Sequence, residues 1–203
     1  MIAFYKSKGA IGMGEMECNM PMDDPMVENL LRQCADAELP VTIHIGPQVG
    51  GCYGLVDDLG LPKLEKMLKK YPHLHIIGHS QPFWAEIDAG VTQETRGGYP
   101  TGKVTEGRLA KILRECPNLW CDLSAQSCYR ALTRDPDYAY GFIEEFADRL
   151  MYAIDYCNPT NVHTYAMAKW LDDSAAAGKI SEENYRKICR ENAIRLLKLP
   201  LEN

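Results

Sequence analysis

Short apolar stretches alternate with amphipathic stretches along nearly the whole chain. Five runs are rich in apolar or β-branched residues. Each is short enough for a strand and almost continuously apolar, as strands covered on both faces tend to be. We therefore predict strands over residues 10–15, 41–45, 74–79, 118–124 and 149–155.

The segments between these runs carry the 3.6-residue spacing of apolar positions that is typical of helices. In residues 61–71, for example, Leu61, Leu64 and Leu68 fall on one face. Asp24, Asp135 and Ser181 stand where a side chain can cap the first turn, and proline follows both aspartates. The expected helices cover residues 25–38, 61–71, 105–115, 136–147, 161–177 and 182–198.

Strands that alternate with helices indicate parallel pairing through right-handed crossovers. This pattern leaves two architectures open, an open doubly wound sheet and a barrel of strand–helix units. No glycine motif for dinucleotides or phosphates occurs. The longest irregular stretch, residues 88–103, is expected to pass over a site rather than to link domains, so we predict one domain over residues 1–203.

Composition and charge narrow the classes of function. The chain has 203 residues, of which 46% are hydrophobic and 25% charged, as in ordinary globular proteins. Its net charge of −6 argues against a nucleic-acid surface, and no apolar run approaches the roughly 20 residues that span a bilayer. The eight cysteines are scattered without a C-x-x-C pair, which favours reduced thiols of a cytoplasmic protein over a zinc–thiolate site.

Polar residues stand at the end of every predicted strand. The set comprises Glu15, His44, His79, Asp122 with Ser124, and Asp155. Because the carboxyl ends of parallel strands meet at one edge, these side chains are expected to converge. Imidazole and carboxylate groups are ligands for divalent metal ions. Each residue alone also has a structural interpretation, such as a cap, an ion pair or the support of a neighbouring histidine. Their recurrence at five strand ends favours a site.

An ordered series of segments resembles the amidohydrolase-2 family of metal-dependent TIM-barrel hydrolases and decarboxylases. The series consists of KGAIGMGE, LPVTIHIG, the stretch from YGLVDDLG to HSQPFWAEI, the stretch from YPTGKVTEG to WCDLSAQS, and YAIDY. The similarity covers nearly the whole chain. It implies an α/β fold of TIM-barrel type, a divalent metal with zinc as the expected ion, and a small carboxylated or cyclic substrate.

The resemblance also implies roles for individual residues. His44, Asp155 and Glu15 match metal-binding positions, although the role of the acid at the position of Glu15 varies in the family. His79 matches a histidine that faces the metal and the substrate, and Asp155 matches a residue that also moves a proton. His79 and Asp155 are therefore the catalytic candidates. The segments that approach the substrate in such proteins carry Tyr53, Trp84, Arg96 and Tyr99.

The chain departs from the family pattern at its start. The family opens with a strand that ends in His-x-His and supplies two metal ligands, and this sequence has no such motif. We therefore expect a partial barrel that lacks about three strand–helix units, or a sequence that is an N-terminal truncation of a longer enzyme. Five parallel strands cannot close a barrel, so exposed sheet edges predict a homo-oligomer.

Three functions stay open at this point. The first is a metal-dependent hydrolase or non-oxidative decarboxylase. The second is a non-catalytic remnant or assembly module that keeps the fold without the reaction. The third is a metal-free enzyme that uses His79 with Asp122 or Asp155 as an acid–base pair.

Overall fold

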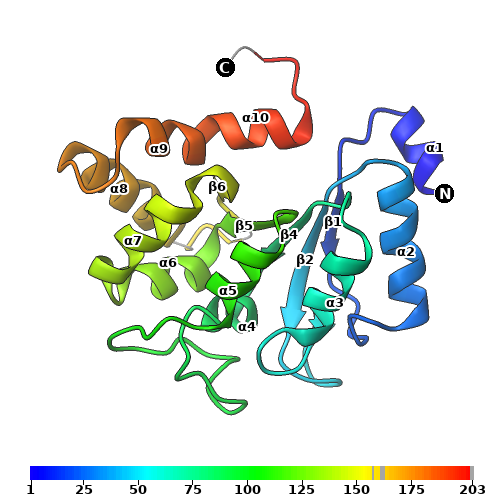
Figure 1. Ribbon diagram of the computed structural model, residues 1–203, viewed down its shortest axis with the longest axis horizontal. Coiled ribbons are helices and arrows are strands. Elements are labelled where there is room, and N and C mark those ends of the chain that lie inside the picture. The colour runs from blue at the N-terminus through cyan, green and yellow to red at the C-terminus, as the bar shows by residue number, and fades with distance from the viewer. Residues whose placement is uncertain (157, 161–162, 202–203) are drawn as a thin grey trace.

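The fold is built on a curved parallel sheet, described by a computed structural model over residues 1–156, 158–160 and 163–201. Five strands lie side by side in the order β1-β2-β4-β5-β6, and a sixth, β3, pairs with the end of β2 (Figure 1). The strands are β1 (Met13–Met16), β2 (Val41–Gly46), β3 (Leu55–Val56), β4 (Ile76–His79), β5 (Leu119–Leu123) and β6 (Leu150–Tyr152). All pairs are parallel, and the main strands follow one another in chain order without the reversal of a doubly wound sheet. The architecture is therefore a partial TIM barrel, as predicted.

All five predicted strands are present, and β3 is an addition that the sequence did not indicate. It consists of two residues, Leu55 and Val56, which pair with Ile45 and Gly46 at the end of β2. A run of two residues is too short to show an apolar period, which is why no strand was predicted there.

Ten α-helices are described, and three of them were not predicted. The predicted helices correspond to α2 (Pro25–Asp36), α3 (Pro62–Lys70), α5 (Arg108–Glu115), α7 (Pro136–Phe146), α8 (His163–Ala176), α9 (Glu182–Arg186) and α10 (Asn192–Leu197). The last two are joined by a π-helical turn over Lys187–Glu191 rather than forming one α-helix. The additional helices are α1 (Ile2–Ser7), α4 (Gln81–Ala85) and α6 (Ala125–Thr133).

Two of the three predicted helix caps are confirmed by side-chain hydrogen bonds. The Asp24 carboxylate accepts a hydrogen bond from the Met26 amide at 2.8 Å, and the Ser181 hydroxyl accepts one from the Asn184 amide at 3.2 Å. Asp135 is the N-cap residue of α7, as predicted, although no capping hydrogen bond of its side chain is found there. The Asp135 carboxylate instead accepts from the Val104 amide at 2.9 Å, and so it fixes the end of the 88–103 segment.

The two faces of the sheet have different coverings. The outer face packs against helices in the main hydrophobic core, which includes Ile43 and Leu119. On the inner face, Ile77, Trp120 and Met151 form a smaller cluster with Leu196 of α10. Within the described residues β1 pairs only with β2, and β6 only with β5, so the sheet forms an open arc rather than a closed barrel.

The irregular segment 88–103 is attached at both of its ends. The Ala89 amide donates to the Thr105 carbonyl at 2.8 Å, and the Asp88 carboxylate accepts from the Thr105 amide at 3.2 Å. Between these ends, the Gln93 amide group donates to the Pro47 carbonyl at 2.8 Å. The segment is therefore held over the loop that follows β2, at the carboxyl end of the sheet.

None of the helices in the described ranges is both long and apolar enough to cross a membrane. Seven cysteines carry free thiols in the structure, and Cys157 lies outside the described residues.

Candidate active site

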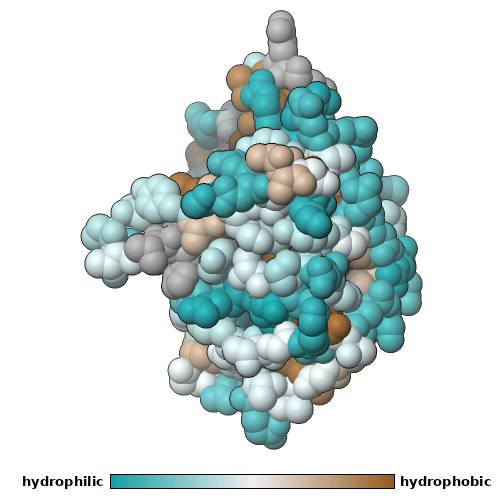
Figure 2. All heavy atoms as spheres, turned by 90° about the vertical axis from the view of Figure 1, so that its left-hand side faces the viewer, coloured by the Kyte–Doolittle hydropathy of each residue, from teal (hydrophilic) through white to brown (hydrophobic). Residues whose placement is uncertain are grey.

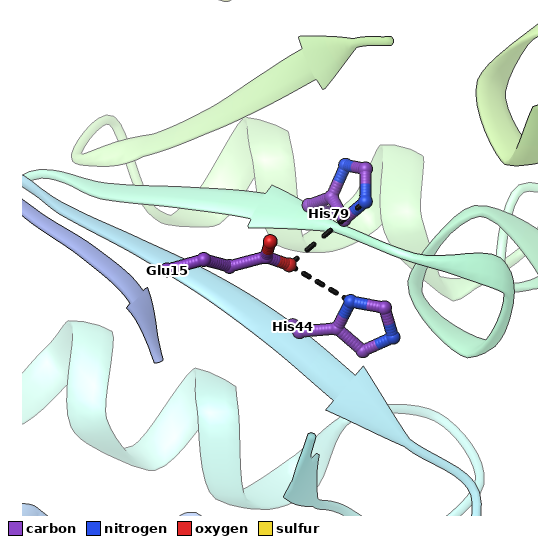
Figure 3. Close-up of side chains that lie close together, drawn as sticks. All are labelled: Glu15, His44 and His79. Carbon is purple, nitrogen blue, oxygen red and sulfur yellow. Dashed lines mark hydrogen bonds and ion pairs between the residues drawn. The ribbon is translucent and has the colours of Figure 1, made fainter. Parts of the chain in front are cut away.

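The carboxyl ends of β1, β2 and β4 bring one carboxylate and two imidazoles together (Figure 3). His44 and His79 occupy paired positions on the neighbouring strands β2 and β4, and their ring centroids are 5.3 Å apart. Oε1 of Glu15 lies 2.8 Å from Nδ1 of His44 and 3.9 Å from Nε2 of His79. One ligand atom from each residue lies within 4.8 Å of the other two, so the predicted convergence is found here.

These three residues fit a divalent ion of the zinc type. Two atoms bonded to one tetrahedral zinc ion at about 2 Å lie roughly 3.3 Å from each other. The separations of 2.8 and 3.9 Å from the Glu15 oxygen lie on either side of that value. Nitrogen and carboxylate oxygen are also the donors that zinc accepts. Three protein ligands with an open fourth position are the usual arrangement of a catalytic zinc site.

The ring of His44 is held by the loop that follows β2. The Tyr53 ring lies 4.4 Å from it, centroid to centroid. The loop backbone can lie this close to the His44 ring only with glycine at position 54, because a Cβ atom there would lie 2.8 Å from Cδ2 of His44. Gly54 also has a φ of 103°, in the region that favours glycine. Local packing thus fixes the orientation of His44, one of the three candidate metal ligands.

His79 is oriented by the end of β5. Its Nδ1 lies 3.2 Å from the Ser124 hydroxyl oxygen and 3.5 Å from Oδ2 of Asp122. A proton on Nδ1 is favoured by these two oxygen atoms, which leaves the lone pair on Nε2 facing Glu15. Asp122 therefore supports a neighbouring histidine, which is one of the structural roles considered for the polar residues at the strand ends.

The charges around the cluster shift two pKa values. Burial alone would lower the pKa of His79, but the Asp122 carboxylate and the charges of Glu15 and Asp155 outweigh burial and raise it. The hydrogen bond from His44 lowers the pKa of Glu15, against the opposing effect of burial, and the charges of both histidines add to the lowering. Glu15 is therefore an anionic carboxylate at neutral pH, which is the form that binds a cation.

The turn after β4 is locked against β2 by Ser80. Its hydroxyl donates to the Ile45 carbonyl at 2.8 Å and accepts from the Ile45 amide at 3.1 Å. Ser80 has a φ of 105°, an uncommon value for a non-glycine residue that surrounding contacts must hold in place. The sharp turn allows α4 to start at once, and it leaves His79 pointing into the site.

A cavity of about 400 Å³ opens beside the cluster. Of the residues predicted for the site, it is lined by His44, His79, Asp155, Tyr53 and Tyr99. Oδ2 of Asp155 lies 3.6 Å from Nε2 of His79, and the Asp155 side chain is 42% exposed. Asp155 therefore stands at the mouth of the cavity, next to the three-residue cluster rather than inside it.

The remaining cavity walls were not predicted from the sequence. They consist of Gln81, Ala125, Gln126, Ser127, Asn158 and Thr160. The Gln81 amide group donates to the Tyr99 hydroxyl at 3.0 Å, which ties the 88–103 segment to α4. Their position in the sequence could have identified two of them, because Gln81 and Gln126 each follow a predicted strand by two residues.

Two predicted substrate-binding residues lie away from this cavity. Trp84 is buried, and its indole nitrogen donates to the Asp122 carbonyl at 3.1 Å. Arg96 is fully buried, and its Nη1 donates to the Asp57 carbonyl at 2.8 Å. Trp84 thus contacts the end of β5, where Asp122 lies, and the Arg96 side chain lies inside the fold.

Comparison with known proteins gives the same picture of the fold. A family described as "Amidohydrolase" matches residues 10–199. A zinc-bound amidohydrolase from Burkholderia multivorans has a TM-score of 0.56 at 18% identity, over 88% of this chain and 59% of its own. An uncharacterised TIM-barrel protein from Bordetella bronchiseptica has a TM-score of 0.55 at 22% identity, over 88% and 52%. A probable 2-pyrone-4,6-dicarboxylic acid hydrolase from Acinetobacter baumannii, with citric acid bound, has a TM-score of 0.58 at 14% identity, over 98% and 68%.

The chain spans between half and three fifths of the Bordetella and Burkholderia structures. No curated protein is similar enough to this sequence to count as a match.

Proposed function

Because the chain belongs to the amidohydrolase family, we propose that it is a metal-dependent hydrolase of a small cyclic or carboxylated substrate. Non-oxidative decarboxylation is the alternative reaction of the same site. The observation that carries the proposal is the meeting of Glu15, His44 and His79 within 4.8 Å, beside a cavity at the carboxyl end of the sheet. This is the end at which barrels of strand–helix units place their chemistry.

We assign the ion, proposed to be zinc, to Glu15, His44 and His79. The sequence resemblance gave the third place to Asp155; we propose His79 instead, because its ligand atom groups with those of Glu15 and His44. When bound, the ion would supply positive charge that polarises a substrate carbonyl and makes a nearby water molecule more acidic. The pair of Asp122 and His79 resembles the carboxylate–histidine arrangement that holds a metal-binding imidazole in one tautomer.

The remaining residues of the site move the proton and hold the substrate. Asp155 is the proposed general base, because its carboxylate is partly exposed and points toward Nε2 of His79 at 3.6 Å. It would accept a proton from the attacking water and return it to the leaving group. Tyr53 and Tyr99 are proposed to bind the substrate ring, since both line the cavity and Tyr53 packs on His44.

Turnover by the purified protein is expected to depend on a divalent metal ion. The assay uses a panel of lactones, cyclic amides and aromatic carboxylates, and it records the ring-opened product and the release of CO₂ in parallel. A ring-opened product would identify hydrolysis, and CO₂ release would identify decarboxylation. Turnover should stop after treatment with a chelator and return on addition of zinc. Turnover that survives the chelator would instead indicate the metal-free acid–base pair. A protein with neither metal nor turnover would be a non-catalytic module.

A second copy of the chain is proposed to cover the β1 edge. β1 is the last strand on its side of the described sheet, and Phe4, Tyr5 and Ile11 are exposed in the segment before it. The opposite side, with α7, α8 and α9, presents a mainly hydrophilic surface (Figure 2). Unpaired edges with apolar neighbours favour association with another chain.

Sedimentation is expected to show a homo-oligomer that Tyr5→Ser weakens. Tyr5 is 55% exposed in α1, so the change removes apolar contact area from the proposed interface without touching the core. The matched control is Tyr165→Ser, at a site that is 66% exposed on α8 and should leave the association unchanged. A monodisperse monomer, or equal effects of the two substitutions, would contradict the proposal.

A further inference from the structure

A second large cavity lies at the opposite end of the sheet from the candidate active site. Its volume is about 490 Å³, and it opens between α10 and the residues that precede β2 and β4. Figure 1 shows α10 lying across this end of the molecule. The cavity is lined by Glu38, Leu39, Pro40, His73, His75, Trp120, Arg195, Leu196 and Lys198.

This cavity is separate from the candidate active site, although both lie on the inner face of the sheet. His75, Ile77 and His79 alternate along one stretch of extended chain, so their side chains project from the same face. At about 3.3 Å per residue, His75 and His79 are roughly 13 Å apart along the strand. Ile77 and Met151 belong to the apolar cluster between the two ends. A ligand in the second cavity would therefore not contact the cluster of Glu15, His44 and His79.

The base of the cavity combines an apolar surface with a hydrogen-bond donor. Trp120 is only 5% exposed, and its Nε1 donates to Nδ1 of His75 at 3.0 Å. Because Nδ1 accepts this bond, the neutral ring of His75 carries its proton on Nε2. Burial and the positive charges of Arg195 and Lys198 lower the pKa of His75, which favours this neutral form. His75 thus offers one N–H group beside an indole ring.

The guanidinium group of Arg195 is fixed in place over that indole. It stacks on the Trp120 ring at 5.1 Å from the centroid. Its Nη2 donates to Oδ1 of Asn192 at 2.8 Å and also to the Asp148 carbonyl. Asn192 is 1% exposed, and its own amide group donates to the Leu150 carbonyl at 2.8 Å. A buried residue therefore braces the cation, which lowers the entropy cost of binding an anion there.

The cavity is cationic in a chain whose net charge is negative. Arg195 and Lys198 carry positive charge among its lining residues, and Glu38 is the acid that faces them. Lys198 pairs with Glu38 at 3.1 Å, but these side chains are 75% and 72% exposed. Exposed pairs of this kind contribute little, so Lys198 can turn to another anion at small cost.

We propose that this cavity binds a small organic oxyanion, a carboxylate or phosphate group attached to a compact apolar body. Arg195 anchors the charge, since its planar fork matches the geometry of both groups. His75 donates a hydrogen bond from Nε2, Lys198 adds charge at the rim, and Trp120 with Leu196 contacts the apolar body. The inference is independent of the reaction proposed for the other end of the sheet.

The test is a titration of metal-free protein with benzoate, inorganic phosphate and neutral benzamide. The metal is first removed with a chelator, and the chelator is then dialysed away, so that no metal binds the anions at the other site and no chelator carboxylate competes for the cavity. Binding is followed by calorimetry and by tryptophan fluorescence, because Trp120 lies in the cavity wall. We expect benzoate or phosphate to bind and benzamide to bind at least tenfold more weakly. The preferred anion decides between a carboxylate and a phosphate ligand.

Arg195→Gln is expected to weaken anion binding at least tenfold. The matched control is Arg186→Gln, which removes the same charge from a surface pair with Glu191 outside the cavity and should change affinity less than threefold. Lys198→Gln changes an exposed side chain, so it tests the site even if Arg195→Gln does not fold. We expect a threefold to tenfold loss for it. The proposal fails if wild-type protein binds neither anion, if benzamide binds as well as the preferred anion, or if Arg186→Gln and the cavity variants lose equal affinity.

Discussion

Replacement of His44 by alanine is expected to abolish binding of a divalent metal ion and, with it, turnover. His44 supplies one of the three ligand atoms that lie within 4.8 Å of one another. Loss of a partner that only supports a ligand typically costs 10–100-fold in affinity, so loss of a ligand should exceed about 100-fold. The measurement is zinc affinity by competition with a chromogenic chelator, together with the metal content of the purified variant.

Two further variants separate metal binding from catalysis. His73→Ala is the matched control, because His73 lines the cavity at the other end of the sheet, away from the three-residue cluster, and its loss should leave zinc affinity unchanged. Asp155→Asn should keep the metal, since Asp155 stands outside the cluster, yet lower turnover by about 10²–10⁴-fold as a lost general base. Wild-type zinc affinity in His44→Ala would contradict the assignment of the site. Loss of zinc from Asp155→Asn would return Asp155 to the role of ligand.

The meeting of the site residues could be predicted because it follows from strand geometry. His44 and His79 end neighbouring parallel strands, and parallel pairing places them at the same register. Glu15 ends the next strand outward, and its side chain is long enough to reach both rings. The alternation of apolar and amphipathic segments was therefore enough to predict a parallel sheet. The polar residues at the strand ends were enough to predict where the cluster lies.

The roles of single residues depended on contacts that the sequence does not encode locally. Asp135 is the N-cap residue that its spacing indicates, but its carboxylate binds Lys103 and Val104, from a segment about thirty residues earlier, which the local pattern does not show. Arg96 lies in a segment that does pass the site, yet its guanidinium turns inward to the Asp57 carbonyl. In both cases a tertiary partner decides what the side chain binds.

The cavity walls were missed for a related reason. Gln81 and Gln126 stand on α4 and α6, and α4 is too short to show a full amphipathic period in the sequence. α4 has five residues, and four of them are buried, so its sequence looks like a continuation of the apolar strand before it. The turn that separates the two depends on the backbone of Ser80, which the hydroxyl bonds to Ile45 hold in place.

Gly78→Ala is expected to lower the free energy of unfolding by about 3 kcal/mol. The ring of Phe83 approaches the backbone closely at Gly78, the residue before His79. A Cβ atom at position 78 would lie 2.1 and 2.2 Å from two ring carbons of Phe83, which is fully buried. Overpacking of this kind costs 1–3 kcal/mol, and the upper end applies because neither the strand nor the buried ring has room to move. Chemical denaturation of the metal-free protein measures the effect.

The matched control for this loss is Gly141→Ala in α7. A Cβ atom there would meet no heavy atom within 4 Å apart from its chain neighbours and the nearby backbone of α7, and alanine is favoured over glycine in a helix by roughly 0.5–1 kcal/mol. The same chemical change should therefore stabilise the protein at position 141 and destabilise it at position 78. The double variant Gly78→Ala with Phe83→Leu is expected to lose less than the sum of the single losses, since the smaller side chain relieves the clash. Additive losses, or a Gly78→Ala variant as stable as the wild type, would show that Phe83 is not what requires glycine before His79.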